Sequence, residues 1–327
     1  MKHQRRVTIA GAGIIGASIA WRLAQAGASV RLVDTGKVGG ESSWAGAGML
    51  APGGEFAEAS WWVSMAIESH RAYPEFVREL ESESGLPIDF QACGAVETAE
   101  SAESWARLTE RAEKLKALGI ESVAGDGNYT FPQDSWVDPR TVMAALRRVC
   151  ELRGVTVLEN APVTEYQAGG EDALVIAAGA WSGGLRIVEN GRVVSLPGTF
   201  PVKGHLIGYR MPPGSLTRIL RRGHTYILQR SNGFTIAGSN EEKVGFERAV
   251  NAETCRDICQ RAAKVWPALA DRKPEETWIG FRPGSATGEP VIGRYAGSRI
   301  WMAYGHYRNG ILMAPATAER IASEISG

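Results

Sequence analysis

The strongest constraint on the fold lies in the first sixteen residues. A β-prone run, Val7–Ala10, passes directly into the glycine-spaced turn Gly11-Ala12-Gly13-Ile14-Ile15-Gly16. Gly11 permits a tight turn, Gly13 lets the backbone approach a pyrophosphate, and Gly16 allows a helix to pack closely on the strand. Free N–H groups at the start of that helix would then face the phosphates. This spacing predicts a β–α–β unit that binds a dinucleotide.

The residues that follow complete such a unit. Apolar side chains at Ile15, Ile19 and Leu23 recur on one helix face, and Val30–Val33 resumes a strand. Asp34 stands at the end of that strand, where its carboxylate would accept hydrogen bonds from the ribose hydroxyls of adenosine. We assign Ile14, Ile15, Asp34 and Thr35 to the cofactor site together with the three glycines. This unit alone does not distinguish NAD from FAD.

Length and charge narrow the class of protein. A chain of 327 residues exceeds what one hydrophobic core usually serves, which favours two cooperating domains. The 36 basic and 36 acidic residues cancel, so the composition indicates no nucleic-acid partner. The N-terminus imitates a secretory signal, but cleavage there would remove the dinucleotide unit. We therefore expect a cytoplasmic protein, without the stretch of about 18 apolar residues that a membrane span requires.

The cysteines indicate neither disulfides nor a metal site. There are four of them, at positions 93, 150, 255 and 259. Cys255 and Cys259 lie one helical turn apart, but no second Cys/His pair lies nearby to complete four metal ligands. We expect ordinary buried thiols in a reducing compartment and no metal.

A second glycine-rich segment, Gly39–Leu50, points to the cofactor. It ends in Ala-Gly-Met-Leu, unlike a flexible linker, and its glycines would let the backbone lie against a flat ligand. Here the chain resembles the D-amino acid oxidase family of FAD enzymes, and within it the glycine oxidases. The resemblance implies non-covalent FAD, with Ser42 and Ser43 near the phosphates and ribitol, and with Ala47, Gly48 and Met49 against the isoalloxazine.

The resemblance continues along the chain in the family's order. Ala173–Ile176 is typical of a buried parallel strand and ends in a glycine turn. Val163, just upstream, matches the residue whose backbone meets the adenine. Near the C-terminus, Gly280–Gly284 and Gly305–Pro315 match the glycine oxidase pattern. The cofactor contacts that the resemblance implies in these segments are Ala178, Gly179, Trp181, His306, Arg308, Asn309, Gly310, Ile311 and Leu312.

We therefore predict an α/β fold: a Rossmann-type FAD-binding domain of the glutathione-reductase kind, with a second, mostly antiparallel-sheet substrate domain. The FAD-binding domain is expected to be discontinuous, over 1–86, 136–190 and 276–327. The substrate domain would take 87–135 and 191–275. Expected strands there are Val202–Tyr209, Thr225–Gln229 and Phe234–Gly238, with Ser231-Asn232-Gly233 as a hairpin turn. Amphipathic helices are expected over Trp61–Leu80, Ser101–Leu118, Pro139–Glu151 and Glu253–Val265.

Oxidising the Cα–N bond of an amino acid requires an anchored carboxylate and a Cα–H aimed at the flavin. Arginine is the natural anchor because its planar fork meets a carboxylate with two parallel charge-assisted bonds. With the family resemblance, we assign that role to Arg282. Tyr226, on a predicted strand, would donate its hydroxyl to the same carboxylate. His224, two residues earlier, is expected on the same face at the pocket mouth.

Arg308 is a second substrate candidate, and the residues after it have a cofactor role. A helix is expected from about Leu312 to Ile325, with Pro315 in its first turn and Asn309 as a cap. The free N–H groups of Gly310–Met313 would then stabilise the reduced flavin ring. Met49 is placed beside the substrate as well as the flavin.

Three features distinguish this chain from its relatives. No cysteine follows Cys259, whereas sarcosine-oxidase relatives carry a flavin-linking cysteine there, so the FAD should be released by denaturation. Residues 164–172 are shorter than the hairpin usual in the family, which would expose the adenine side of the cofactor. Glu241 stands near the position where glycine oxidases have an apolar residue over the substrate. If its side chain points inward, it would favour a substrate that carries an extra cation. Otherwise it lies at the solvated end of a hairpin.

The sequence predicts FAD-dependent oxidative deamination of glycine or a small amino acid or secondary amine, with O₂ as acceptor and H₂O₂ as product. A D-amino acid dehydrogenase that passes electrons to a quinone is the nearest alternative, although a membrane-binding stretch is missing. A flavin-binding sensor or scaffold is a second, disfavoured by the pairing of Arg282 with Tyr226. The exact substrate and the oligomeric state, including a homo-oligomer, stay open. The family resemblance also implies a link to thiamine biosynthesis.

Overall fold

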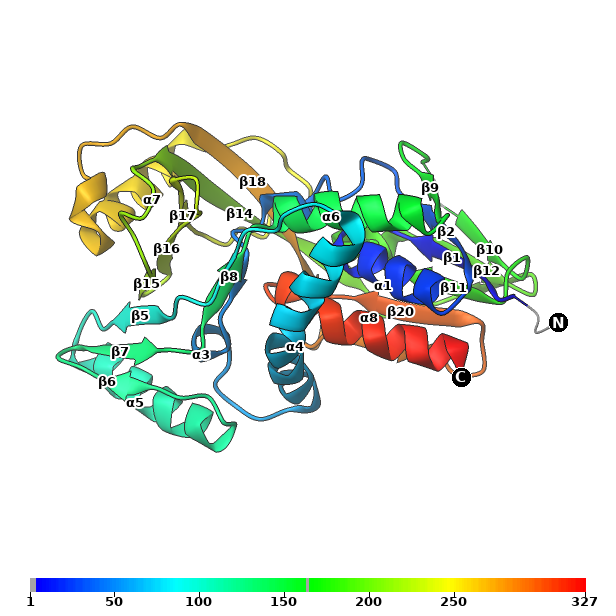
Figure 1. Ribbon diagram of the computed structural model, residues 1–327, viewed down its shortest axis with the longest axis horizontal. Coiled ribbons are helices and arrows are strands. Elements are labelled where there is room, and N and C mark those ends of the chain that lie inside the picture. The colour runs from blue at the N-terminus through cyan, green and yellow to red at the C-terminus, as the bar shows by residue number, and fades with distance from the viewer. Residues whose placement is uncertain (1–3, 163–164) are drawn as a thin grey trace.

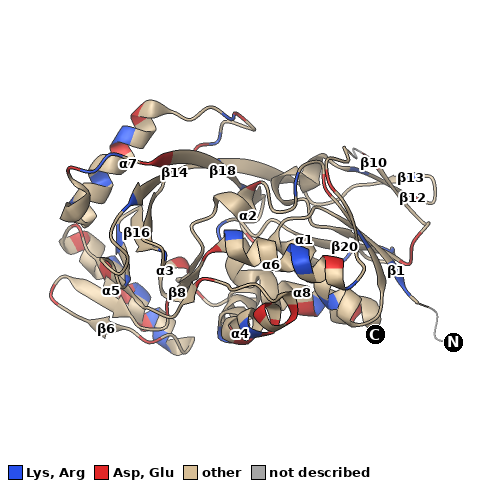
Figure 2. Ribbon diagram, turned by 45° about the horizontal axis from the view of Figure 1, so that its top comes forward, with Lys and Arg blue, Asp and Glu red and all other residues tan. Residues whose placement is uncertain are grey.

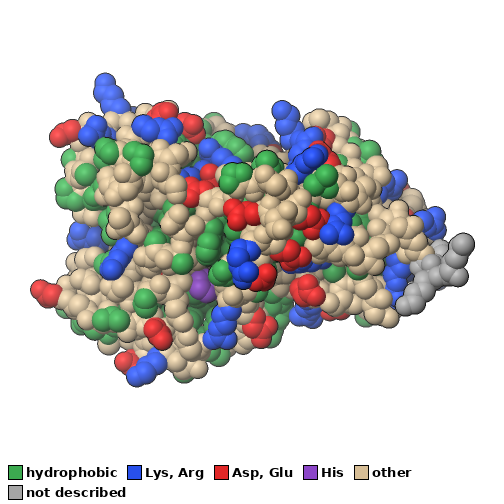
Figure 3. All heavy atoms as spheres, viewed as in Figure 1, with side chains coloured by type: hydrophobic (Ala, Val, Ile, Leu, Met, Phe, Trp, Pro, Cys, Tyr) green, Lys and Arg blue, Asp and Glu red, His purple; other side chains and the backbone are tan. Residues whose placement is uncertain are grey.

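The computed structural model describes residues 4–162 and 165–327. Two large sheets organise the chain (Figure 1), and both termini lie in the half that is built on the parallel sheet. No helix among the described residues is long and apolar enough to cross a membrane. Basic and acidic residues alternate along helices such as α5 and α7 (Figure 2), and both signs are interspersed on the face seen in Figure 3.

The first sheet has six strands in the order β19-β20-β11-β1-β2-β9. Its central strand β1 (Arg6–Ala10) pairs in parallel with both β2 (Ser29–Val33) and β11 (Ala173–Ile176). β11 is buried at all four residues, because it lies between β1 and β20. The remaining strands are β9 (Thr156–Leu158), β20 (Ile300–Tyr304) and the antiparallel edge strand β19 (Val291–Arg294). This is the predicted Rossmann-type sheet, so that prediction is confirmed.

Four helices pack with one another beside this sheet: α1 (Ile14–Gln25), α4 (Trp61–Ser84), α6 (Pro139–Leu152) and α8 (Gly310–Ser326). The predicted helices at 61–80 and 139–151 match α4 and α6 closely. The prediction for the C-terminal helix is wrong at its start, because α8 begins at Gly310 and encloses Pro315.

The Ser69 hydroxyl of α4 explains how α8 continues past its proline. It donates to the Leu312 carbonyl at 2.7 Å and accepts from the Ala316 N–H at 3.1 Å. These two groups would otherwise bond to each other within the helix. A side chain from a neighbouring helix therefore bridges the interrupted ladder, which makes an internal proline tolerable.

The second sheet has eight strands in the order β18-β14-β17-β16-β15-β5-β7-β6. The predicted strands are present as β14 (Thr199–Arg210), β16 (Thr225–Gln229) and β17 (Phe234–Gly238). β18 (Glu276–Ser285), which the expected boundaries gave to the FAD-binding part, pairs with β14 along its whole length. The other members are β5 (Ala95–Thr98), β6 (Val123–Ala124), β7 (Asn128–Phe131) and β15 (Ile219–Arg222), of which β15 and β5 are parallel.

The remaining elements are short or flank this sheet. α5 (Ala102–Ala117) and α7 (Ala252–Val265) match their predicted helices. β10 (Glu165–Ala168), from the short connection noted above, joins β12 (Arg186–Glu189) and β13 (Arg192–Val194) in a three-stranded sheet. Further elements are α2 (Ser42–Ala45), α3 (Pro52–Glu55), β3 (Met49–Leu50), β4 (Phe90–Gln91), β8 (Ser135–Val137) and the short 3₁₀ helices η1 (Gly179–Gly184) and η2 (Pro267–Leu269).

Candidate active site

A cavity of about 740 Å³ runs from the carboxyl ends of the parallel strands to the face of the eight-stranded sheet. Residues of β1, β2 and β20 and of the turns after β1, β2 and β11 line one end, and residues of β14, β16 and β18 line the other. Sites for ligands of α/β sheets lie at this edge, and the volume is within the range of cofactor sites.

The first end of the cavity is built by glycines that have no room for a side chain. A Cβ on Gly11, whose φ is +105°, would lie 2.4 Å from the Ala177 carbonyl oxygen. A Cβ on Gly16 would lie 1.9 Å from the Gly11 carbonyl oxygen, because helix α1 starts against β1. The Ile14 N–H, at the helix start, donates to the Ser43 hydroxyl at 2.9 Å. Backbone donors and a closely packed helix start are what a pyrophosphate requires.

Asp34 is held firmly at the end of β2. Its two carboxylate oxygens accept from the Ala12 N–H at 2.7 Å and from the Gly36 N–H at 2.8 Å. Both bonds fix the carboxylate beside the glycine turn, where it lines the cavity. Each carboxylate oxygen keeps a further acceptor site for a ribose hydroxyl. Turn, helix start and acid together fit the ADP part of FAD.

The second glycine-rich segment lies along the middle of the cavity. Ser42 donates its hydroxyl to the Phe281 carbonyl, and the Trp278 indole N–H donates to the Ala45 carbonyl at 2.9 Å. Both contacts fasten α2 to β18. Gly48 has a φ of +93°, and a Cβ there would lie 1.8 Å from the Val137 carbonyl oxygen. The segment therefore presents backbone and small side chains to the cavity, which fits a flat ring system.

Arg282, Tyr226 and Arg308 meet at the far end of the cavity, from β18, β16 and the turn before α8. Glycines on neighbouring strands make room for the first two. A Cβ on Gly204 would lie 2.4 Å from Arg282 Nη1, and one on Gly238 would lie 2.6 Å from the Tyr226 hydroxyl. Both side chains therefore lie across glycine backbone. An anion bound among the three residues would contact the guanidinium groups of both arginines and the hydroxyl donor of the tyrosine.

The two arginines differ in their partners. Arg308 lies 3.0 Å from Glu55 and 3.7 Å from Glu241, and the Glu55 carboxylate raises the pKa of Arg308. Arg282 instead donates to two neutral acceptors, the Asn240 carbonyl at 3.0 Å and the Ser239 hydroxyl at 2.6 Å. Burial raises the pKa of Tyr226, although both arginines oppose that rise, so its phenol stays protonated as a donor.

His306 lines the cavity just before α8. Its ring is 3% exposed, and Nε2 lies 3.2 Å from the Thr317 hydroxyl. Burial alone lowers the pKa of His306 to about 3, so the imidazole is neutral near pH 7. Gly310 and Ile311, the first residues of α8, line the same end of the cavity and direct the helix start towards it.

Most of the predicted site residues line this one cavity. They are Gly11, Gly13, Ile14, Ile15, Asp34, Thr35, Ser42, Ser43, Ala47, Gly48, Met49, Ala178, Gly179, Trp181, Tyr226, Arg282, His306, Arg308, Gly310 and Ile311. Gly16, Asn309 and Leu312 are not among the described residues that line it, and Asn309 lines a smaller pocket nearby. Asn309 occupies the position before α8, but its side chain makes no capping bond. Val163 lies outside the described residues.

His224 does not reach the place expected for it. β15 ends at Arg222 and β16 begins at Thr225, so His224 lies in the tight turn between them. Strand alternation, which predicted a shared face with Tyr226, does not extend into a turn. The residue is exposed and is not among the described residues that line the cavity.

Sequence reasoning missed several residues of this lining, notably Glu55, Tyr166, Arg248 and Tyr307. Glu55 contacts Arg308, 253 positions away, so no local sequence pattern predicts that it belongs to the site. Its one sequence signal is its place five residues after the Ala-Gly-Met-Leu run. Glu241, left open above, has a half-exposed side chain and faces Arg308 at the cavity end.

Comparisons with known proteins agree with this geometry. The family described as "FAD dependent oxidoreductase" (DAO) matches residues 6–324. Glycine oxidase of Bacillus licheniformis is 31% identical over the whole chain and 94% of its own length, and that of Bacillus subtilis is 30% identical over 99% and 94%. The bifunctional protein ThiO/ThiG of Synechocystis is 31% identical over 99% of this chain and 52% of its own. The crystal structure of glycine oxidase from Geobacillus kaustophilus superposes with a TM-score of 0.91 at 27% identity, over 98% and 95% of the two chains.

Proposed function

Because the chain belongs to the DAO family of FAD-dependent oxidoreductases and is an amine or amino acid oxidase, we propose that it deaminates glycine or a similarly small amino acid. The acceptor would be O₂ and the second product H₂O₂. The observation that carries the proposal is the meeting of Arg282 and Tyr226 at one end of a cavity whose other end is built for a dinucleotide. The glycine oxidase relatives support the choice of a small substrate.

The chain's own residues would bind and orient the substrate. Arg282 offers two parallel N–H donors to the substrate carboxylate, and the Tyr226 hydroxyl donates to the same group. Bound FAD supplies the acceptor for the hydride that leaves Cα. Fixing the carboxylate restricts the Cα–H to one direction, which lowers the entropic part of the barrier.

Arg308 would have a different role in substrate binding from Arg282. Glu55 and Glu241 already balance its charge, so it attracts a second carboxylate less strongly than an unpaired arginine would. Met49 and Leu206 line the cavity beside this end and leave little polar surface for a long charged side chain. Both features favour a substrate with a single carboxylate and a short side chain.

The test is a peroxide-coupled assay of the purified yellow protein with glycine, sarcosine and a panel of D-amino acids. Arg282→Ala should raise KM about 100-fold, because it removes charge-assisted hydrogen bonds together worth roughly 3 kcal/mol. The kcat should fall far less, since the lost contact holds substrate and transition state alike. Arg256→Ala, at an exposed position on α7, is the matched control and should behave as wild type.

Other results would redirect or end the proposal. Anaerobic bleaching of the flavin by an amino acid, without peroxide in air, would assign a dehydrogenase that uses another acceptor. A protein whose flavin no amine bleaches would be a flavin-binding protein of another kind, and the proposed reaction would be wrong.

A further inference from the structure

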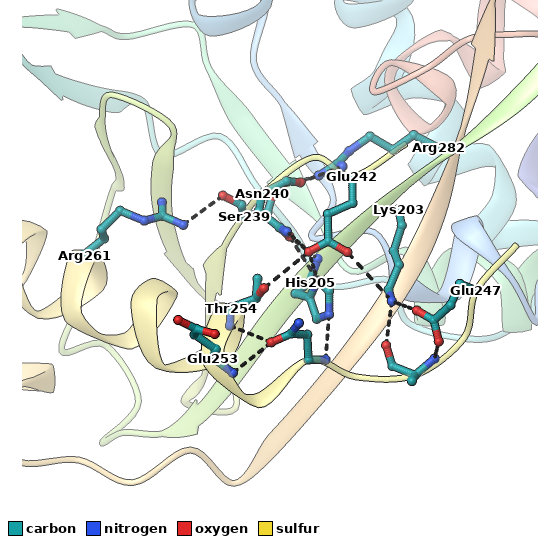
Figure 4. Close-up of polar contacts among 12 residues, drawn as sticks. Lys203, His205, Ser239, Asn240, Glu242, Glu247, Glu253, Thr254, Arg261 and Arg282 are labelled. Atoms are coloured by element: carbon teal, nitrogen blue, oxygen red, sulfur yellow. Dashed lines mark hydrogen bonds and ion pairs between the residues drawn. The ribbon is translucent and has the colours of Figure 1, made fainter. Parts of the chain in front are cut away.

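The segment Ser239–Asn251, between β17 and α7, is irregular but is fastened to β14 (Figure 4). Lys203 and His205 alternate with Gly204 along β14, so their side chains point away from the face on which Gly204 lines the cavity. Both are almost completely buried, at 1% and 0% exposure. The segment covers them, and both fasten it to β14.

Lys203 holds the middle of the segment. Its ammonium donates to the Glu247 carboxylate and to the Ala249 carbonyl at 2.6 Å, and it lies 3.8 Å from the Glu242 carboxylate. The backbones of Lys203 and Glu242 also exchange two hydrogen bonds of 2.9 Å each. Two of the three ammonium donors are hydrogen-bonded and the charge faces two carboxylates, so this attachment is specific in geometry.

His205 holds both ends of the segment, and its tautomer sets which nitrogen binds which end. Nε2 accepts from the Asn251 N–H at 3.0 Å, so in the neutral ring the hydrogen is on Nδ1. That nitrogen lies 3.1 Å from Asn240 Oδ1, which also accepts from the His205 backbone N–H at 2.8 Å. The Asn240 side-chain N–H group donates to Glu242 at 2.7 Å. Asn240 is therefore oriented at both ends of its amide.

The oriented Asn240 backbone in turn contacts Arg282. Its carbonyl accepts from Nη1 at 3.0 Å, and the Ser239 hydroxyl accepts from Nη2 at 2.6 Å. These bonds use two of the five guanidinium donors and leave three. Among the described residues, no carboxylate is in an ion pair with Arg282, whereas Arg308 has two. Neutral acceptors thus hold Arg282 in place without cancelling its charge.

We propose that His205 and Asn240 are positioning residues for Arg282, with Lys203 holding the middle of the same segment. They act through the Asn240 carbonyl and Ser239 hydroxyl, and they keep the guanidinium aimed at the carboxylate of the substrate. This inference rests on the proposed function, because it presumes a carboxylate ligand at Arg282.

The test measures carboxylate binding directly. Glycolate, a carboxylate without an amine, is titrated into the flavoprotein and followed by the change in flavin absorbance. His205→Ala and Asn240→Ala should each weaken glycolate binding and raise KM about five- to ten-fold, the loss expected for about one neutral hydrogen bond. The kcat should stay within about two-fold, because a bound substrate is still carried to the same transition state.

Two further variants separate positioning from mere folding. His205→Gln keeps an acceptor for Asn251 and a donor for Asn240, and should recover most of the lost affinity. Lys243→Ala, exposed on the same segment, should bind glycolate as wild type does. Asn240→Ala removes no buried ring and keeps the test decisive if His205→Ala does not fold.

The outcomes are distinguishable. Wild-type protein that binds glycolate, with His205→Ala and Asn240→Ala binding it equally well, would overturn this inference and leave the proposed function standing. A fall in kcat without a change in glycolate affinity would overturn it too. If neither wild type nor Arg282→Ala responds to glycolate, the carboxylate site itself is absent and the proposed function fails with it.

Discussion

At the scale of the residue, the pKa of His306 makes a prediction about stability. The unfolded chain takes up a proton on this side chain near pH 6.5, but the folded protein does so only near pH 3. Above pH 6.5 His306 is neutral in both states and does not change the free energy of unfolding. Below pH 6.5 that free energy falls by up to about 1.4 kcal/mol per pH unit, because only the unfolded chain is protonated at this residue. Thermal unfolding of the flavoprotein between pH 7.5 and 5 should show a shallower decline for His306→Gln, which keeps a partner for Thr317. Equal slopes in the two proteins would mean that His306 takes up its proton as readily in the folded protein as in the unfolded chain.

The place of a single residue in the site was predictable where a family motif contains that residue. It was not predictable where two distant segments come into contact only in the folded protein. Arg282 and Tyr226 line one cavity, as the resemblance implied. The acceptors that hold Arg282 come from Ser239 and Asn240, more than 40 positions earlier. Nothing in the local sequence indicates that contact, because only the register of β14 with β17 and β18 creates it.

At the scale of the element, we predict that FAD binding depends on the close packing of the start of α1 against β1. Gly16→Ala places a Cβ where the Gly11 carbonyl oxygen lies, so α1 must move away from β1. We expect loss of most of the bound FAD and a lower melting temperature, because the helix start no longer faces the phosphates. Flavin content after gel filtration measures the first effect and thermal unfolding the second. Gly170→Ala, with nothing within 4 Å of the added carbon, should keep its flavin; a flavin-replete Gly16→Ala protein would contradict the close packing.

Elements with a regular apolar period were predicted well. The helices α4, α5, α6 and α7 and the strands β14, β16 and β17 lie where the sequence indicates. The C-terminal helix shows why periodicity fails locally. Proline at position 315 argued for a start at Leu312, but a hydroxyl from α4 satisfies the interrupted ladder and the helix begins earlier. A tertiary contact overrides a local rule, and the sequence gives no sign of it.

At the scale of the whole molecule, one buried ion pair joins the eight-stranded sheet to the turn that carries Glu55. Arg221 on β15 donates to Asp134 at 2.5 Å and to Glu97 at 3.0 Å, and Asp134 also accepts from the Gly53 N–H at 2.9 Å. Asp134 is fully buried, and burial raises its pKa while Arg221 opposes that rise. The geometry of α3, and with it the Glu55–Arg308 contact, therefore depends on a charge from the other sheet.

Arg221→Met should lower the free energy of unfolding by about 3–5 kcal/mol at pH 7.5, because it leaves the buried Asp134 carboxylate facing only His70, whose pKa burial lowers. In this variant the pKa of folded Asp134 lies above its unfolded value, so the folded protein binds the proton more tightly. The loss relative to wild type should then shrink as the pH is lowered from 7.5 towards 5, and adding Asp134→Asn should recover part of the loss without that pH dependence. Denaturant unfolding at both pH values measures these effects.

The control is Arg222→Met, at the next residue. The ion pair of Arg222 with Glu100 is partly exposed and 3.8 Å long, so it contributes less than about 1 kcal/mol. Equal losses for Arg221→Met and Arg222→Met would show that the buried pair does not join the two halves of the molecule.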